Sequence, residues 1–364
     1  MSLQCGIVGL PNVGKSTLFN SLSSAKAEAA NFPFCTIEPN VGVISVPDER
    51  LQILEGLVRP QKVIPTTIEF VDIAGLVKGA SQGEGLGNKF LANIREVDAI
   101  IHVVRCFADD NVVHVAGSVD PVFDKEVIDT ELQLKDLESV DKKIIRLEKT
   151  AKSGDATSRK QLATLQQYKQ LLESGQNARS LSLPPEDREA VADLFLLTAK
   201  PVIYVANVDE ASIHTGNAYV EALQEAVRAE SAEVVVISAA IESQIAELDP
   251  DERSLFLEEY GLKESGLNRL IRASYRLLNL ITYFTAGEKE VRAWTIVDGW
   301  KAPQAAGVIH SDFEKGFIKA EVIKLTNYQQ YGSEHACKEA GKMGIEGKEY
   351  LVKDGDIMHF RFNV

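Results

Sequence analysis

The sequence predicts a doubly wound α/β domain with a mostly parallel sheet, an inserted antiparallel helical arm and a small β-rich C-terminal domain. Three observations predict this fold. Short runs rich in Val and Ile suit parallel strands that are covered on both faces. Between residues 126 and 198 the apolar residues recur every three or four positions, which indicates helices. After about residue 280, short alternating runs separated by glycine turns indicate strands.

The predicted strands of the α/β domain lie at residues 5–9, 67–71, 99–104, 202–206 and 234–237. The arm is expected to consist of two helices, because two apolar faces flank a Ser-Gly-Asp break at residues 153–155. Leu137, Val140, Ile144 and Leu147 form the first face, and Leu162, Leu165, Tyr168 and Leu172 form the second. A third helix, at residues 186–197, is expected to return the chain to the sheet.

These patterns predict three domains. Residues 1–125 and 199–280 are expected to form the α/β domain, residues 126–198 the helical insertion and residues 281–364 the β-rich domain. Strand-like runs at residues 290–297 and 316–323 support the last of these. In a doubly wound sheet, ligands bind at the carboxyl ends of the strands, so the loops at those ends are the places to look for chemistry.

The first such loop carries the most specific motif in the chain. Residues 9–16 read GLPNVGKS, a complete G-x-x-x-x-G-K-[ST] phosphate loop between an apolar strand and a helical stretch. Backbone N–H groups of the loop and the N-terminus of the helix favour a bound pyrophosphate. Lys15 is expected to reach the β- and γ-phosphates, and the Ser16 hydroxyl to bind Mg²⁺.

Two further segments complete the predicted phosphate and metal site. Asp72 ends the second strand in the sequence DIAG, where it is expected to hold a Mg²⁺-bound water while the Gly75 N–H reaches the γ-phosphate. Thr36 lies between the first helix and the next strand, and we expect it to close over the nucleotide and give Mg²⁺ a second hydroxyl ligand. The glycine-rich residues 75–87 indicate a segment that reorganises with the nucleotide.

The loop after the strand at residues 202–206 predicts the base. GTPases place N-K-x-D here, but this chain has Asn207, Val208, Asp209 and Glu210. The longer Glu210 carboxylate is displaced from the guanine edge, whereas adenine does not need that acid and Asn207 can still meet it. The sequence therefore predicts ATP over GTP, while guanine recognition by Asp209 through a register shift stays open. Backbone contacts to the base are expected from the last base loop, Ser238, Ala239 and Ala240.

Slow hydrolysis is expected, because Leu76 stands where many GTPases carry the Gln that orients the attacking water. Two residues are candidates to compensate. Asn12, inside the phosphate loop, is placed to help hold a monovalent cation such as K⁺ against the phosphates. His114, shortly after the strand at residues 99–104, is the second candidate, for a catalytic role.

The formal net charge of −14 argues against a nucleic-acid binder that uses its whole surface. Residues 142–160 are the exception, with seven basic and two acidic side chains. This segment is either a contact for RNA phosphates or a solvated helix face, and the sequence leaves both open. The four cysteines lack metal-ligand spacing, and neither a signal peptide nor a membrane span is recognisable, so we expect a cytoplasmic protein without membrane contact. We also expect a monomer.

Taken together, these motifs resemble the Obg-like ATPase family, also called YchF. The resemblance extends over essentially the whole chain. It rests on residues 9–16, 31–36, 72–77, 88–91, 129–132, 207–210, 284–287, 309–317 and 354–356. It implies a P-loop NTPase of the translation-factor-related class, with a G-like domain, a helical coiled-coil arm and a C-terminal β-grasp-like TGS domain. Members are associated with ribosomes and with stress responses.

The resemblance also implies roles for individual residues. The phosphates would be bound by Asn12, Val13, Gly14, Lys15, Ser16 and Thr17. Mg²⁺ would be bound by Ser16 and Thr36, and adenine by residues 207–210. One departure is that residues 342–344 lack the Arg expected there, which puts an RNA contact at that position in doubt.

The function expected from the sequence is a Mg²⁺-dependent ATPase that works slowly as a nucleotide-dependent switch and reads out its state to a ribosome or RNA. Two alternatives remain at this point. One is a regulatory binding module in which hydrolysis is incidental, and the other is a GTPase that tolerates a degenerate base loop.

Overall fold

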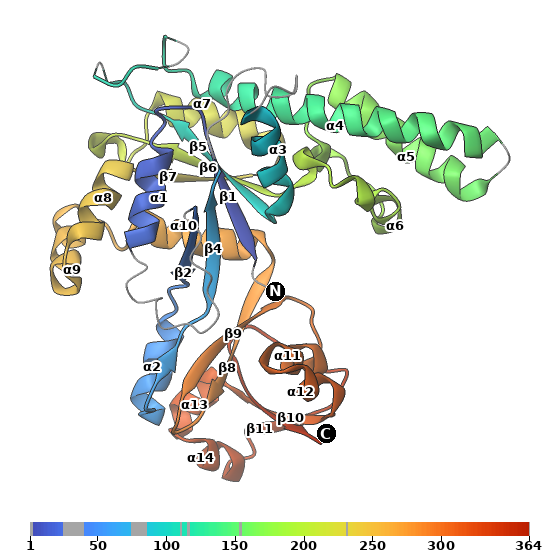
Figure 1. Cartoon of the computed structure of the whole chain (residues 1–364). Coiled ribbons are helices and arrows are strands. Elements are labelled where there is room, and N and C mark those ends of the chain that lie inside the picture. The colour runs from blue at the N-terminus through green and yellow to red at the C-terminus, as the bar shows by residue number, and fades with distance from the viewer. Residues whose placement is uncertain are drawn as a thin grey trace. The chain divides into compact units, whose positions relative to one another are not determined.

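The computed structural model describes residues 3–24, 40–73, 86–109, 111–114, 117–152, 155–230 and 232–363 (Figure 1). It divides the chain into two compact units, each of which is described by itself. The first unit comprises Met1–Val43 and Glu69–Leu270, and the second comprises Ile44–Ile68 and Ile271–Val364.

A six-stranded sheet in the order β2-β4-β1-β5-β6-β7 forms the centre of the first unit. Its strands are β1 (Gln4–Val8), β2 (Val41–Ser45), β4 (Thr67–Asp72), β5 (Ala99–Arg105), β6 (Val202–Asn207) and β7 (Glu233–Ile237). The pairs β1–β4, β1–β5, β5–β6 and β6–β7 are parallel. Every residue of β5 and β6 is buried, as expected of strands covered on both faces. The predicted α/β class and its strands are thereby confirmed.

Helices surround this sheet (Figure 1). They are α1 (Lys15–Ser24), α3 (Leu86–Glu96), α7 (Ala218–Val227), α8 (Ala239–Glu247), α9 (Pro250–Glu259) and α10 (Gly266–Leu277). Helices α1 and α8 pack against each other, which brings the two loops that precede them close together. Asn217 caps α7, because its side chain accepts a hydrogen bond from the Val220 N–H at 3.1 Å.

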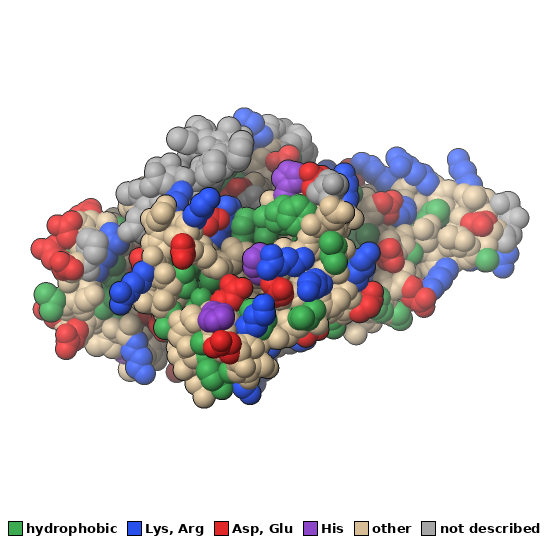
Figure 2. Space-filling model, turned by 90° about the horizontal axis from the view of Figure 1, so that it is seen from below, with side chains coloured by type: hydrophobic (Ala, Val, Ile, Leu, Met, Phe, Trp, Pro, Cys, Tyr) green, Lys and Arg blue, Asp and Glu red, His purple; other side chains and the backbone are tan. Residues whose placement is uncertain are grey.

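The helical insertion consists of α4 (Pro121–Lys152) and α5 (Ala156–Glu173), which lie side by side (Figure 1). Asp155 starts α5 by accepting a hydrogen bond from the Ser158 N–H at 2.7 Å. The two apolar faces meet, with Val140, Leu165 and Tyr168 buried in one cluster. Figure 2 shows that Lys and Arg side chains are interspersed with acidic ones over this part of the surface.

The predicted third helix at residues 186–197 is wrong in its extent. The structure has a short helix, α6 (Pro185–Glu189), followed by single 3-10 turns at Ala192–Leu194 and Leu197–Ala199. A continuous helix cannot run through Phe195, whose backbone is left-handed with φ 46° and ψ 53°. Beyond it, the buried carboxylate of Asp136 on α4 accepts hydrogen bonds from the Leu197 and Thr198 N–H groups, both at 2.8 Å. These N–H groups bond to a side chain instead of continuing a helix.

The second unit contains a mixed sheet in the order β11-β10-β12-β8-β9-β3. Its strands are β3 (Val63–Ile64), β8 (Leu280–Ala286), β9 (Val291–Val297), β10 (Phe317–Lys324), β11 (Met343–Glu346) and β12 (Asp356–Phe362). Its helices are α2 (Glu49–Val58), α11 (Ala302–Ile309), α12 (Ser311–Lys315), α13 (Leu325–Tyr331) and α14 (Glu334–Glu339). Neighbouring β8 residues Tyr283 and Phe284 enter different core clusters, because successive side chains on a strand point to opposite faces. Both faces of this sheet are therefore covered.

The domain boundaries differ from the prediction at residues 44–68, which the sequence assigned to the α/β domain. In the structure β3 pairs with β9, through Val63 and Val291, and Leu54 of α2 packs in the same cluster as Phe284. This segment therefore belongs to the C-terminal unit. It joins a partner more than 200 residues away along the chain, which local sequence patterns do not reveal.

None of the helices in the described part of the chain has both the length and the apolar character needed to cross a membrane. The described cysteines Cys5, Cys106 and Cys337 are buried and form no disulfide with one another. Burial raises the pKa of Cys106 to about 12, so this thiol stays protonated and unreactive.

A group of buried charges lies where α4 covers the sheet. Lys125 pairs with Asp129 at 2.6 Å and with Glu230 at 2.8 Å, and Arg179 contacts the same Glu230 at 2.7 Å. His102 on β5 is also buried here, against the ring of Tyr204. We refer to Lys125, Asp129, Arg179 and Glu230 as the buried charge cluster.

We expect the stability of the first unit to fall in mild acid because of His102. Burial, with smaller effects of Asp129 and Lys125, lowers the pKa of His102 to about 4. Its unfolded pKa lies near 6.5, so the neutral ring's full stabilisation is present above pH 6.5 and is lost as the pH falls towards 4. The loss amounts to about 3 kcal/mol. Urea unfolding of the wild type and of His102→Gln at several pH values will measure it. An equal pH dependence of both proteins between pH 6.5 and 4.5 would contradict the assignment.

Candidate nucleotide site

The phosphate loop at residues 9–16 connects β1 to α1 and depends on its glycines. Asn12 and Gly14 have positive φ angles of 64° and 93°. A Cβ at Gly14 would lie 2.2 Å from the Asn207 amide nitrogen, and one at Gly9 would lie 2.8 Å from the Val103 carbonyl oxygen. A side chain at either position would therefore clash, and only glycine lets the loop fold back over the sheet.

Of the predicted phosphate and metal residues, Lys15, Ser16, Thr17 and Asp72 are among the described residues, and they lie at or near the start of α1. Lys15 forms an ion pair with Asp72 at the end of β4. The Lys15 side chain is 10% exposed and that of Asp72 is 24% exposed, so neither is freely solvated. Ser16 and Thr17 are exposed in the first turn of α1. A cation, a carboxylate and a hydroxyl are thus held close to the N-terminus of a helix, which favours anions.

The oxygen donors present fit Mg²⁺, which prefers carboxylates, hydroxyls and phosphate oxygens. Asp72 supplies the carboxylate and Ser16 the hydroxyl. Thr36 and Gly75, the other two residues predicted to act here, lie outside the described residues, as does most of the glycine-rich segment at residues 75–87. Their roles remain predictions.

Asn207 joins the phosphate loop to both base loops. Its amide nitrogen donates to the Val13 carbonyl oxygen at 2.9 Å, and its side-chain oxygen accepts from the Ala239 N–H at 2.9 Å. The side chain is only 4% exposed. Asn207 therefore fixes the two walls of the site, and any contact with a base must use its remaining hydrogen-bonding capacity.

The other base-loop residues divide into buried and exposed ones. The Val208 side chain is 2% exposed and belongs to the core, so it does not offer the surface that a Lys stem would provide. Ser238 is buried too, and its hydroxyl has no hydrogen-bond partner among the described residues, whereas Ala240 is exposed. Glu210 is exposed and accepts a hydrogen bond from Gln244 at 3.3 Å.

Asp209 is the residue that would take over guanine recognition if the loop shifted register. In the structure its carboxylate accepts a hydrogen bond from the Ser212 N–H at 2.9 Å and caps a 3-10 turn, Glu210–Ser212. The geometry gives no support to the register shift, because it would require Asp209 to give up this cap.

Asn12 and His114, the two candidates for assisting hydrolysis, lie close together. The Asn12 side chain donates to the Val113 carbonyl oxygen at 3.1 Å, and His114 is the next residue. The His114 ring is 6% exposed and contacts the Asp124 carboxylate at 2.9 Å. Burial raises the pKa of Asp124, while its hydrogen bond to His114 acts in the opposite direction. His114 is thus held beside the phosphate loop by a buried acid.

Arg105 is a site residue that the sequence analysis missed. It ends β5, is fully buried and donates to the carbonyl oxygens of Phe107 at 3.1 Å, Val112 at 2.9 Å and Asp109 at 3.2 Å. These bonds hold the segment that receives Asn12. The available signal was an arginine directly after six apolar or neutral strand residues, a position where a charge must find partners.

Comparisons with known proteins find relatives along the whole chain. Residues 4–152 match the family model MMR_HSR1, described as a 50S ribosome-binding GTPase, and residues 280–363 match YchF-GTPase_C, described as a protein of unknown function. Curated relatives named ribosome-binding ATPase YchF, from Haemophilus ducreyi and Bacillus subtilis, are 58% and 57% identical, with 100% of this chain and of each relative covered. The solved structure of the Schizosaccharomyces pombe YchF GTPase gives a TM-score of 0.90 at 40% identity, covering 99% of this chain and 98% of that one.

Proposed function

Because this chain belongs to the YchF family, we propose that it hydrolyses ATP to ADP and phosphate and uses the bound nucleotide as a switch in ribosome binding. The observation that carries the proposal is the pairing of Lys15 with Asp72 at a glycine-dependent phosphate loop. The relatives' name, ribosome-binding ATPase, supports the choice of nucleotide and partner.

The residues of the loop account for binding and orientation. The N–H groups at the start of α1 and the Lys15 ammonium bind the β- and γ-phosphates, and Lys15 exchanges its contact with Asp72 for them. Ser16 and Asp72, with Thr36, would hold Mg²⁺, which neutralises charge on the phosphates when bound. Asn12 would help hold K⁺, and His114 is proposed to help place the attacking water. Hydrolysis removes the γ-phosphate and with it the contacts that order the loops.

The remaining features follow from this assignment. We infer that the protein works in the cytoplasm, since its relatives are named for ribosome binding. The arm at residues 126–198 and the C-terminal unit, which resembles a TGS domain, are the proposed contacts to the ribosome. A regulatory binding module with incidental hydrolysis remains the second candidate, favoured by the absence of the water-orienting Gln at Leu76.

We expect the wild-type protein to bind ATP more tightly than GTP in calorimetry. We expect Glu210→Asp to raise the affinity for GTP about tenfold, which is roughly what one added hydrogen bond contributes. The shorter Asp carboxylate stands where guanine recognition needs it, and the exposed Glu210 can be replaced without disturbing the core.

Asp209→Asn is the matched control, because Asn keeps the cap on Ser212 but removes the charge that would read guanine. We expect it to leave both affinities unchanged. A wild-type protein that prefers GTP, or an Asp209→Asn variant that loses GTP binding, would establish the degenerate-loop GTPase instead.

A further inference from the structure

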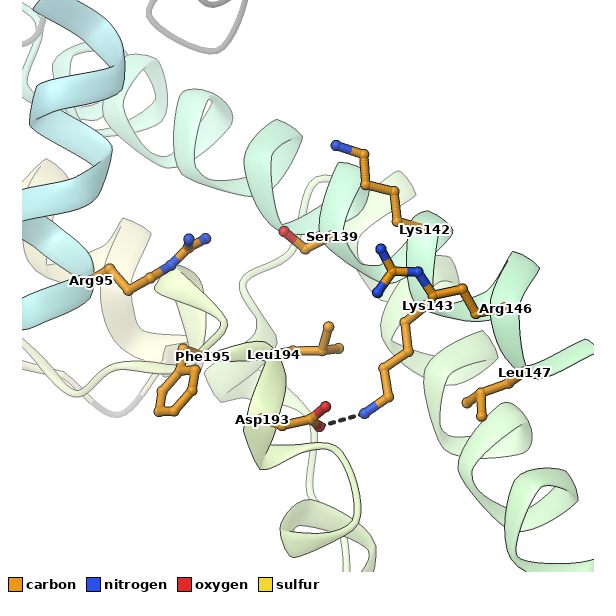
Figure 3. Close-up of a pocket in the computed structure, with 9 residues that line it drawn as sticks. All are labelled: Arg95, Ser139, Lys142, Lys143, Arg146, Leu147, Asp193, Leu194 and Phe195. Carbon is orange, nitrogen blue, oxygen red and sulfur yellow. Dashed lines mark hydrogen bonds and ion pairs between the residues drawn. The ribbon is translucent and has the colours of Figure 1, made fainter.

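A basic groove lies beside helix α4 of the arm, and none of its lining residues belongs to the nucleotide site. It has a volume of about 430 Å³ and is lined by Arg95, Ser139, Lys142, Lys143, Arg146, Leu147, Asp193, Leu194 and Phe195. Arg95 and Phe195 lie on one side, and Lys142, Lys143 and Arg146 of α4 lie on the other (Figure 3). We call it the Arg95 groove. Its size is within the roughly 300–1,000 Å³ of ligand pockets.

The groove is positively charged in a strongly acidic protein. Four cations and one carboxylate line it, a local net of three positive charges. Lys143 is neutralised by Asp193, and Lys142 contacts Glu138 on the same helix. Arg95 and Arg146 are exposed, and neither forms an ion pair with a described acidic residue. The two arginines therefore carry the charge that is available to an anion, and their planar guanidinium groups suit phosphate.

Phe195 gives the groove an aromatic surface at the cost of backbone strain. Its φ and ψ of 46° and 53° are left-handed, a rare conformation for a bulky residue, and its side chain is 64% exposed. The neighbouring Leu194 and Leu196 both pack in the core of the arm. The turn thus keeps two leucines inside and holds a large apolar ring in water beside two arginines.

We propose that the Arg95 groove binds a single-stranded RNA segment, with Arg95 and Arg146 on phosphates and one unstacked base on the Phe195 ring. An exposed aromatic ring beside cations matches the way proteins hold single strands, whose bases are free to stack, whereas a duplex hides its base faces. The inference deepens the proposed function, since it rests on ribosome binding and supplies the RNA contact.

The test is fluorescence anisotropy of the full chain with a labelled single-stranded RNA of mixed sequence, without nucleotide or ribosomes, over a series of KCl concentrations. Arg95→Ala with Arg146→Ala is expected to weaken binding at least tenfold and to reduce the slope of log affinity against log salt by about 1.4, the share of two phosphates. Phe195→Gly is expected to weaken binding about fivefold with the slope unchanged. Glycine suits the left-handed backbone, so this variant will fold.

Two controls locate the effect. Arg228→Ala with Lys263→Ala removes the same charge from exposed positions of the first unit that lie outside both the groove and the arm. We expect this pair to change the affinity less than twofold, because distant surface charges are largely screened by salt. Phe195→Tyr keeps the aromatic face and is expected to bind as the wild type does.

Several outcomes would overturn the proposal. These are wild-type protein that does not bind the RNA, an equal loss of affinity in the control pair Arg228→Ala with Lys263→Ala, or a Phe195→Gly variant that binds like wild type. Binding of a polyglutamate peptide that depends on Arg95 and Arg146, with RNA binding indifferent to Phe195, would identify an acidic protein partner instead. If the wild type hydrolyses ATP and co-sediments with ribosomes, but the groove variants bind RNA as tightly as the wild type, the groove proposal is wrong and the proposed function stands. Wild-type protein that binds the RNA but does not co-sediment with ribosomes would reject the proposed function alone.

Discussion

Replacing Lys15 by alanine is expected to weaken ATP binding by about two to four orders of magnitude, because charged hydrogen bonds to two phosphates contribute roughly 1.5–3 kcal/mol each. The variant also leaves Asp72 without its partner, which places an uncompensated carboxylate next to the incoming phosphates. Calorimetry measures the affinity, and phosphate release measures the loss of hydrolysis. Ribosome co-sedimentation should no longer differ between ADP and a non-hydrolysable ATP analogue, since the switch has lost its ligand.

Lys263→Ala is the control for this change. Lys263 is an exposed lysine of the same unit, far along the chain from the phosphate loop, so its removal tests only the loss of a positive charge. We expect it to leave ATP affinity unchanged. If Lys15→Ala bound ATP as tightly as the wild type, the assignment of the phosphate loop itself would be wrong. If it lost ATP but kept nucleotide-independent ribosome binding, the regulatory binding module would gain support.

The elements that could be predicted from the sequence are those specified by local patterns. The strand predicted at residues 99–104 is β5 (Ala99–Arg105), because a short run rich in Ile and Val favours a covered strand over a helix. The phosphate loop was recognisable since its glycines are required by close backbone approach at Gly9 and Gly14. The helical arm was recognisable because the apolar faces of α4 and α5 repeat at helical spacing.

What escaped prediction depends on contacts between distant parts of the chain. Residues 44–68 carry no signal of belonging to the C-terminal unit, since β3 has only two residues and its partner β9 lies far along the chain. The expected end of the helix at residues 186–197 is instead held by Asp136, an acid on another helix that binds the Leu197 N–H. Arg105 is visible in the sequence as an odd charge, but its three carbonyl partners follow only from the fold.

The buried charge cluster also forms only when distant parts of the chain come together. We expect its disruption to have the largest effect on the free energy of unfolding. Arg179→Ala should lower the free energy of unfolding by about 3–5 kcal/mol, the cost typical of breaking a buried ion pair from one side. Arg179 contacts Glu230 at 2.7 Å and Asp129 at 3.7 Å, and it donates to the Thr198 carbonyl oxygen at 3.1 Å. Burial by itself raises the pKa of Asp129, but Lys125 and Arg179 together hold it below its usual value. Without Arg179, two buried acids share a single lysine.

Arg228→Ala is the matched control for this experiment. Arg228 pairs with Glu225 on the surface at 3.1 Å, with both side chains more than half exposed, so its loss should cost less than about 1 kcal/mol. Arg179→Lys keeps the positive charge but not the forked geometry of the guanidinium group. We expect its loss of unfolding free energy to lie between those of the other two variants. Urea unfolding followed by circular dichroism measures all three variants. Equal costs for Arg179→Ala and Arg228→Ala would show that the cluster is solvated and that α4 is held to the sheet by apolar packing alone.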